Sequence, residues 1–204
     1  MSLQGEVMDA VPSELAFLLD DDIMNGTSAG YPAGLLNANA LISVAKEAGQ
    51  AASTLVSENI IKMWARMWSR SKANSVWLIN TDVTPQLHKL NLSVGTGGML
   101  TYMPPGGLSS APFGTLYGRP IVETEFNATL GTVGDIILAD LSQYKLANVG
   151  GMQTASSIHV QFLTDQMVWR FTTRYDGQVT WESALTPFKG TNTVSPFVAL
   201  ATRS

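Results

Sequence analysis

The chain of 204 residues contains no cysteine, only two histidines and a low share of charged side chains. Without cysteine it can form no disulfide framework, no thiolate metal site and no cysteine nucleophile. Charged residues make up 14% of the sequence, well below the roughly 25% of a typical soluble domain. Interface cores are depleted of charge, so this composition suits an assembling protein, and a mildly apolar monomer is the alternative.

Long hydrophobic runs are also absent. No stretch approaches the roughly 18 apolar residues of a membrane span, and the first ten residues lack a basic segment followed by an apolar one. We therefore expect no membrane association. Because 16 Asp and Glu outnumber 12 Lys and Arg, for a formal charge of -4, a dedicated electrostatic nucleic-acid binder is disfavoured.

Apolar side chains are plentiful at 45%, enough for the core of one large domain or two small ones. Helical spacing predicts a short helix from Glu14 that ends near Asn25, another over 41–56, one that Ser57 caps, and a short one over 84–90. In the third of these, the residues expected on the buried side are Ile60, Ile61, Trp64, Met67 and Trp68.

Apolar runs and alternation predict five strands, at 75–79, 120–126, 135–139, 167–175 and 193–202. Asp176-Gly177 is typical of a hairpin turn, after which a strand is expected to return through 178–181. The segment 93–114 is rich in Gly, Pro and Ser and predicts a long loop with at most a small hairpin. Helices and strands together indicate an α+β fold.

Two groups of basic residues are candidate binding surfaces. Lys62, Arg66 and Arg70 recur every four residues and so line one face of a helix, and Arg170 and Arg174 share one face of the late strand. These stripes can face a nucleic-acid backbone or acidic groups of neighbouring molecules. Solvated faces are the more frequent use of such stripes.

Four residues are candidates for acid–base catalysis: Glu123 and Glu125, which share a predicted strand face, and His88 and His159. A small hydrolase requires at least two of them within hydrogen-bond reach. Neither histidine lies in a zinc or nucleophile motif, and there is no Gly-x-Ser-x-Gly elbow. We therefore predict no enzymatic activity.

Two further patterns imitate ligand sites. Asp20, Asp21 and Asp22 resemble the start of a calcium loop, but Met24 stands where an oxygen ligand is needed. The glycine cluster at 95–98 lacks the Gly-Lys-Ser/Thr ending of a phosphate-binding loop. We expect no metal ion and no cofactor.

Six segments occur in a distinctive order along the chain: Phe17–Asn37 with its Pro32-Ala33-Gly34-Leu35-Leu36 turn, Trp77–Leu90, Gly114–Val122, Val133–Tyr144, Phe162–Gly177 and Ser195–Leu200. Together they resemble the major capsid proteins of tailed bacteriophages and prophages, which have the Hong Kong ninety-seven type shell fold. The Gly134-Asp135 to Tyr144 stretch is the most specific of them.

The resemblance implies an axial mixed sheet flanked by helices, and a peripheral antiparallel sheet with the end of a long spine helix. Residues 1–35 and 145–188 are expected to be peripheral, 36–144 axial, and 189–204 a strand that returns to the axial part. The resemblance also implies that the N-terminal arm, the extended loop and most of the spine helix of that family would precede residue 14 and are therefore expected to be missing from these residues.

The function that the resemblance implies is a structural subunit of a phage or prophage head. Such subunits self-assemble into pentamers and hexamers that enclose DNA without sequence preference, with scaffold, head protease and portal as further partners. The protein is then expected in the virion, and in the bacterial cytoplasm during assembly. Two alternatives remain, a phage tail or decoration subunit and the small hydrolase.

Overall fold

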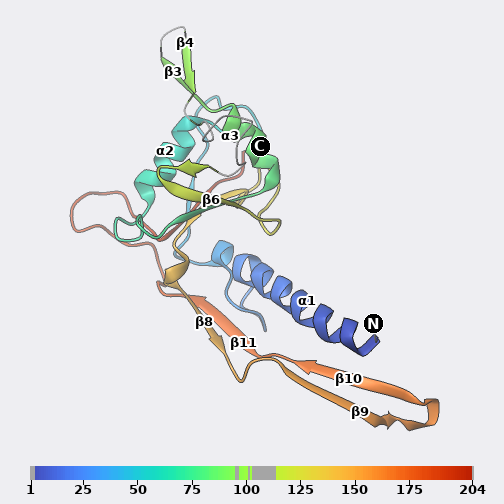
Figure 1. Cartoon of the computed structure of the whole chain (residues 1–204). Coiled ribbons are helices and arrows are strands. Elements are labelled where there is room, and N and C mark those ends of the chain that lie inside the picture. Colours follow the sequence, from blue (N-terminus) through green and yellow to red (C-terminus); the bar gives the residue numbers. More distant parts are fainter. Residues whose placement is uncertain (1–2, 95–96, 101, 103–113, 204) are drawn as a thin grey trace.

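Continuous apolar runs form the middle of a six-stranded mixed sheet (Figure 1). This computed structural model describes residues 3–94, 97–100, 102 and 114–203. The central strands are β12 (Phe197–Leu200), β7 (Ile136–Ala139) and β2 (Val76–Ile79), and their side chains are almost all buried. Strands covered on both faces lose polar alternation, which is why these runs are continuous in sequence.

The sheet has the strand order β1-β12-β7-β2-β6-β5. Its outer strands are β1 (Ile42–Val44), β6 (Arg119–Glu123) and β5 (Thr115–Leu116). β1 runs parallel to β12, and β2 runs parallel to β6, whereas the β12–β7, β7–β2 and β5–β6 pairs are antiparallel. The sheet is therefore mixed, as predicted.

Alternate residues of the central strands supply two separate cores, because successive side chains point to opposite faces. On one face, α2 (Ser57–Arg66) and α3 (Thr84–His88) contribute to a cluster that includes Met63, Trp77 and Leu138. On the other face, Met24 and Leu35 pack in a cluster with Ile137. Met24 belongs to α1 (Leu3–Asn25), and Leu35 begins the short 3-10 helix η1 (Leu35–Asn37).

The second part of the molecule is elongated (Figure 1). It consists of α1 and two antiparallel ribbons that extend away from the sheet in the same direction. In one ribbon, β8 (Tyr144–Asn148) pairs with β11 (Tyr175–Val179). In the other, β9 (Gln153–Gln161) pairs with β10 (Gln166–Thr172). A small hairpin of β3 (Asn91–Val94) and β4 (Gly97–Leu100) projects from the opposite end.

The turn between α1 and η1 is held by close backbone contact. A Cβ atom on Gly34 would lie only 2.7 Å from the carbonyl carbon of Asn25 and 2.8 Å from the carbonyl oxygen of Met24. The Nδ2 group of Asn37 donates to the carbonyl oxygens of Asn25 and Gly26, each at 2.9 Å. Any side chain at Gly34 would therefore push the end of α1 away from the sheet.

The buried pair Arg203–Asp135 anchors the end of the chain, and both side chains are fully buried. The Asp135 carboxylate also accepts from the backbone N–H of Gly131 at 2.9 Å and of Ile136 at 2.8 Å. Arg203 donates from Nε to the Thr54 carbonyl at 2.7 Å. Every charge in this cluster thus has a partner, as burial requires.

Three helix predictions need correction, one of them entirely. The segment 41–56 is not a helix, since β1 is followed by turns in which Gly49 and Ser53 adopt positive φ angles that a helix does not allow. Conversely, α1 begins at Leu3 and continues through Pro12, well before the predicted start. α2 buries Ile60 and Met63, whereas Ile61 is exposed.

The predicted hairpin turn at Asp176-Gly177 is also wrong. These residues lie inside β11, where they pair with Ala147 and Leu146. The chain instead reverses direction at 162–165, between β9 and β10, where Asp165 has a left-handed φ of 52°. Residues 95–96, 101 and 103–113 lie outside the described residues, so most of the predicted loop and part of the 95–98 glycine cluster do too.

Candidate assembly surface

The first basic stripe does not exist as one surface, which corrects the prediction for Lys62, Arg66 and Arg70. α2 ends at Arg66, so Arg70 lies beyond the helix, with its guanidinium 5.7 Å from the ring centroid of Trp68. Lys62 forms an ion pair with Glu47 at 2.7 Å. Arg66 donates from Nε to the Thr193 carbonyl at 2.6 Å. Two of the three cations are therefore already engaged within the chain.

The second basic pair is brought together. Arg170 and Arg174 line one cavity of about 220 Å³, with Thr172, Gln153 and the backbone of 149–151. Both arginines are exposed. Neither forms an ion pair within the part of the chain that the structure describes. We call this feature the arginine groove.

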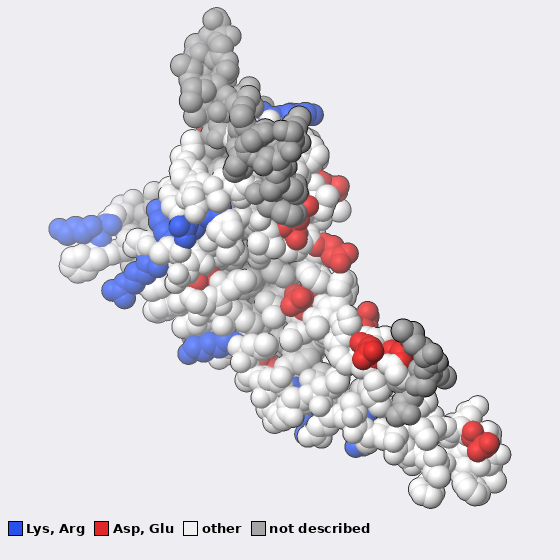
Figure 2. Space-filling view, in the orientation of Figure 1, with Lys and Arg blue, Asp and Glu red and all other residues white. Residues whose placement is uncertain are grey.

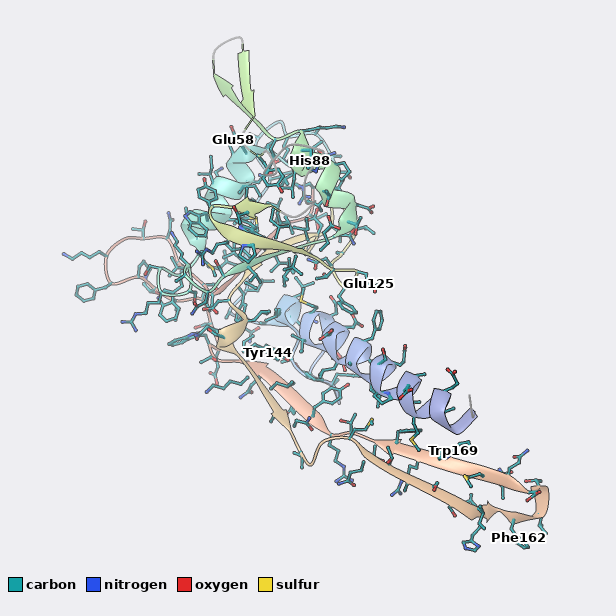
Figure 3. The ribbon with its side chains drawn as sticks, viewed as in Figure 1. Glu58, His88, Glu125, Tyr144, Phe162 and Trp169 are labelled. Atoms are coloured by element: carbon teal, nitrogen blue, oxygen red, sulfur yellow. The ribbon has the colours of Figure 1, made fainter. Side chains whose placement is uncertain are left out.

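The candidate catalytic residues are dispersed (Figure 3). His159 is exposed on β9, and Glu125 lies beyond the end of β6, so it does not share a strand face with Glu123 as predicted. Glu123 accepts a hydrogen bond from the Thr84 hydroxyl at 2.5 Å. Within the described residues, no hydrogen bond joins either histidine side chain to either glutamate. The geometry offers no acid–base pair.

The three consecutive aspartates end α1 and serve as anchors. Asp21 accepts from Asn25 Nδ2 at 2.7 Å, and Asp22 accepts from the Tyr175 hydroxyl at 3.0 Å. Among the described residues, no group of three His, Asp or Glu side chains is arranged to hold a metal ion. Two of the three carboxylates therefore have roles in holding the helix end.

The β9–β10 ribbon exposes a large apolar surface. Its exposed apolar side chains are Ile158, Val160, Phe162, Leu163 and Met167. Phe162 is 72% exposed and Leu163 is 98% exposed, and Figure 3 places Phe162 at the tip of the ribbon. An isolated two-stranded ribbon is only marginally stable in water. Large apolar patches at such positions mark surfaces that another protein covers.

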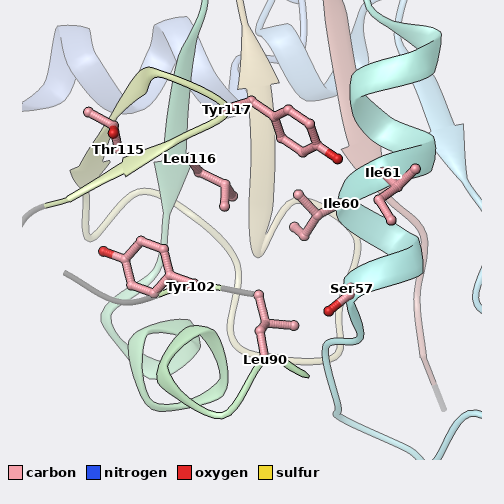
Figure 4. Close-up of a pocket in the computed structure, with 8 residues that line it drawn as sticks. All are labelled: Ser57, Ile60, Ile61, Leu90, Tyr102, Thr115, Leu116 and Tyr117. Atoms are coloured by element: carbon pink, nitrogen blue, oxygen red, sulfur yellow. The ribbon is translucent and has the colours of Figure 1, made fainter. Parts of the chain in front are cut away.

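A further apolar pocket opens beside α2. Its cavity of about 320 Å³ is lined by Ile60, Ile61, Leu90, Leu116 and Tyr117, among others (Figure 4). The loop after β11 carries Phe188, which is 99% exposed and lines another cavity with Ala65 at the end of α2. The surface of the sheet part thus has apolar features at several separate places, as heterologous contacts between copies require.

Comparison with known families identifies the chain. A sequence model described as the phage capsid family matches residues 1–190. The chain belongs to the phage capsid family. Its structural relatives include the capsids of an empty and of a native GTA particle, each computed with C5 symmetry. Both superimpose with a TM-score of 0.75 at 13% identity.

The superposition covers 99% of this chain and 67% and 66% of the two GTA capsid chains, so the chain spans about two thirds of their length. No curated protein sequence matches it. The resemblance to phage major capsid proteins and the predicted α+β capsid fold are confirmed. This capsid-family chain is a structural subunit of a shell, and nothing supports the hydrolase or the tail alternative.

The sequence reasoning missed two features of this capsid subunit. The strand β9 was not predicted, although Ile158 and Val160 alternate with polar residues there. The arginine groove was visible only as two residues on one strand face, because its other wall comes from 149–153. Among the described residues, no helix is long and apolar enough to cross a membrane.

The contact between α1 and β11 should weaken in alkali. Burial first, then the hydrogen bond to Asp22 and the charge of Asp22, raise the pKa of Tyr175 above its ordinary 10.0. A raised tyrosine pKa means that the fold favours the neutral phenol. Its contribution to stability is therefore complete below about pH 10 and is lost as the pH rises through the folded-state pKa.

We expect Tyr175→Phe to lower the free energy of unfolding by about 1 kcal/mol at neutral pH, because one hydrogen bond is lost. The variant should also lose less stability than the parent between about pH 8 and pH 11. Urea unfolding at these pH values measures both effects. Asp22→Asn is the control, since it removes the charge but keeps an acceptor. An identical alkaline loss in the parent and in Tyr175→Phe would contradict the assignment.

Proposed function

We propose that this capsid-family chain assembles into rings of five and six copies, which close into a shell around DNA. The observation that carries the proposal is the β9–β10 ribbon, because its tip exposes Phe162 and Leu163 on a two-stranded ribbon that is only marginally stable alone. A ring requires that one surface of each copy contact a different surface of the next copy. The C5 symmetry in which the related GTA capsids were computed supports rings of five.

In this proposal the mixed sheet part, 36–144 with 189–204, lies near the centre of each ring. The elongated part, 1–35 and 145–188, lies at the periphery and contacts neighbouring copies and rings. Scaffold, head protease and portal are proposed partners during assembly in the bacterial cytoplasm. The chain itself is proposed to have no catalytic role, and its final location is the virion.

The proposal predicts that polar substitutions at the ribbon tip abolish assembly without unfolding the subunit. We expect Phe162→Ser with Leu163→Ser to reduce the yield of shells and rings by about tenfold or more. The reason is that every copy loses the apolar burial of its ribbon tip against a neighbour. Negative-stain microscopy and light scattering of the full-length protein, expressed with its genomic neighbours, measure assembly. Thermal unfolding measures the fold, and the midpoint should stay unchanged.

The control is Val133→Ser, which removes an apolar side chain that is 37% exposed from a loop of the sheet part. This variant should assemble like the parent. A parent protein that stays monomeric with its neighbours present would overturn the proposed function. If the Phe162→Ser, Leu163→Ser variant formed normal shells, the ribbon tip would not be part of the contacts between copies.

A further inference from the structure

Charge is distributed very unevenly along this chain. α1 carries six acidic side chains and no Lys or Arg. All 12 Lys and Arg of the chain therefore lie outside α1 and residues 1–2. Figure 2 shows acidic side chains over the region of α1 and basic side chains along the lower edge of the elongated part. The elongated part thus has one strongly acidic element and a separate basic surface.

Three of the six acidic residues of α1 lie along one exposed face of the helix. Glu6, Asp9, Ser13, Ala16 and Asp20 follow each other at intervals of three and four residues, and all five are exposed. Residues at this spacing share one face of a helix. The middle of the stripe carries only the small side chains of Ser13 and Ala16, so another backbone can approach it closely. We call this face the acidic stripe.

The arginine groove lies on the face of its ribbon that points away from α1. Figure 3 places Trp169 on the side of β10 that faces α1, and strand residues alternate between faces, so Arg170 points the other way. Gln153 pairs with Thr172 and lines the same groove. The groove and the acidic stripe of one copy are therefore separate surfaces, and both remain open to other molecules.

We propose that the arginine groove binds the acidic stripe of α1 from a second copy of this chain. The inference rests on the proposed function and names one of its subunit contacts. β10 ends at Thr172, so Arg174 lies two residues beyond it. Residues four apart in extended backbone are separated by at most about 13 Å, and two helix residues eleven apart by about 16 Å. Arg170 and Arg174 can therefore reach Asp20 and Asp9 of a neighbour with their long side chains. Arginine forms bidentate contacts with carboxylates.

The surroundings of the groove favour a protein over DNA as its occupant. Val149 and Met152, at its edge, are exposed apolar side chains, which gain nothing from a phosphate backbone. Because each copy offers a groove to one neighbour and a stripe to another, the contact is heterologous and can close a ring.

Charge reversal tests this contact in the full-length protein. Arg170→Glu with Arg174→Glu, and separately Asp9→Lys with Asp20→Lys, should each reduce assembly by about tenfold or more. The chain that carries all four substitutions should recover assembly, because the reversed surfaces are again complementary. Lys89→Glu with Lys189→Glu changes the charge equally, away from the groove, and should assemble like the parent.

The absence of cysteine permits a direct second measurement. Ala16→Cys and Gln153→Cys, introduced in separate chains, can be joined by a short bismaleimide only between copies. We expect a crosslinked dimer from the mixture and none from either variant alone.

Three results would overturn the inference. One is parent-like assembly of both charge-reversed variants, and the second is the absence of a mixed crosslink in assembled particles. The third is parent-like assembly of Arg170→Glu with Arg174→Glu accompanied by loss of nucleic acid from the particles, which would assign the groove to DNA. A parent that forms no shells would instead reject the proposed function.

Discussion

Replacing Arg203 with leucine is expected to lower the free energy of unfolding by about 3–5 kcal/mol, because it leaves the Asp135 carboxylate buried without its counter-charge. Both side chains have no exposed surface. Arg203 also donates to the carbonyls of Thr54 and Ala201, at 2.7 Å and 3.2 Å. The substitution therefore removes side-chain contacts to the segment around Thr54 and to Asp135 at the end of the 131–135 turn. Urea unfolding of the purified protein measures the change.

A double substitution separates the charge from the packing. Arg203→Leu with Asp135→Leu should be less destabilised than the sum of the single variants, because no uncompensated charge remains. Arg203→Lys keeps the charge but cannot form the two-point contact, so an intermediate loss is expected. If Arg203→Leu cost less than about 1 kcal/mol, the pair would be no more than an exposed surface contact.

Trp77→Ala is expected to be similarly severe, at about 3–5 kcal/mol, because it opens a large cavity in the central sheet. Trp77 is fully buried in β2, and its indole Nε1 donates to the Leu116 carbonyl at 2.9 Å. The alanine variant loses this bond as well as the packing between β2, β5 and α2. Thermal and urea unfolding report the loss, and shell formation should fall with it.

Trp77→Phe is the matched control that separates aromatic packing from the indole hydrogen bond. It keeps most of the apolar volume but removes the hydrogen bond and the smaller ring of the indole, so a loss of about 1–2 kcal/mol is expected. Equal losses in the alanine and phenylalanine variants would show that the bond, and not the packing, dominates. Loss of assembly in Trp77→Phe at unchanged stability would place this site in a subunit contact, contrary to its burial.

The central strands were predictable because burial on both faces leaves an unambiguous apolar run, as at 136–139 and 197–200. The helix predicted over 41–56 does not form. Alanines at helical spacing contribute little burial, and the positive φ angles of Gly49 and Ser53 are incompatible with a helix. The end of α1 at Asn25 was predicted correctly, since the Gly26 turn follows it. Its start was not, because Pro12 is tolerated inside this helix.

For the arginine groove, the sequence predicted the two arginines but not the residues that surround them. Arg170 and Arg174 share a strand face in any extended conformation, whereas Lys62, Arg66 and Arg70 share a face only if the helix continues to Arg70, which it does not. The residues that wall the groove come from 149–153 and were assigned no role. Their approach depends on the pairing of β9 with β10, which is a long-range contact.

The sequence by itself determined the α+β class, the buried strands, the acidic character of α1 and the ordered motifs of a phage capsid protein, because these follow from local composition and spacing. Only the tertiary structure decided which cations stay unpaired and where the ribbon turns. It also joined Arg203 to Asp135, which lie 68 residues apart in the chain. Such contacts depend on which segments distant in sequence come together, whereas a local pattern fixes only which face of a segment is buried.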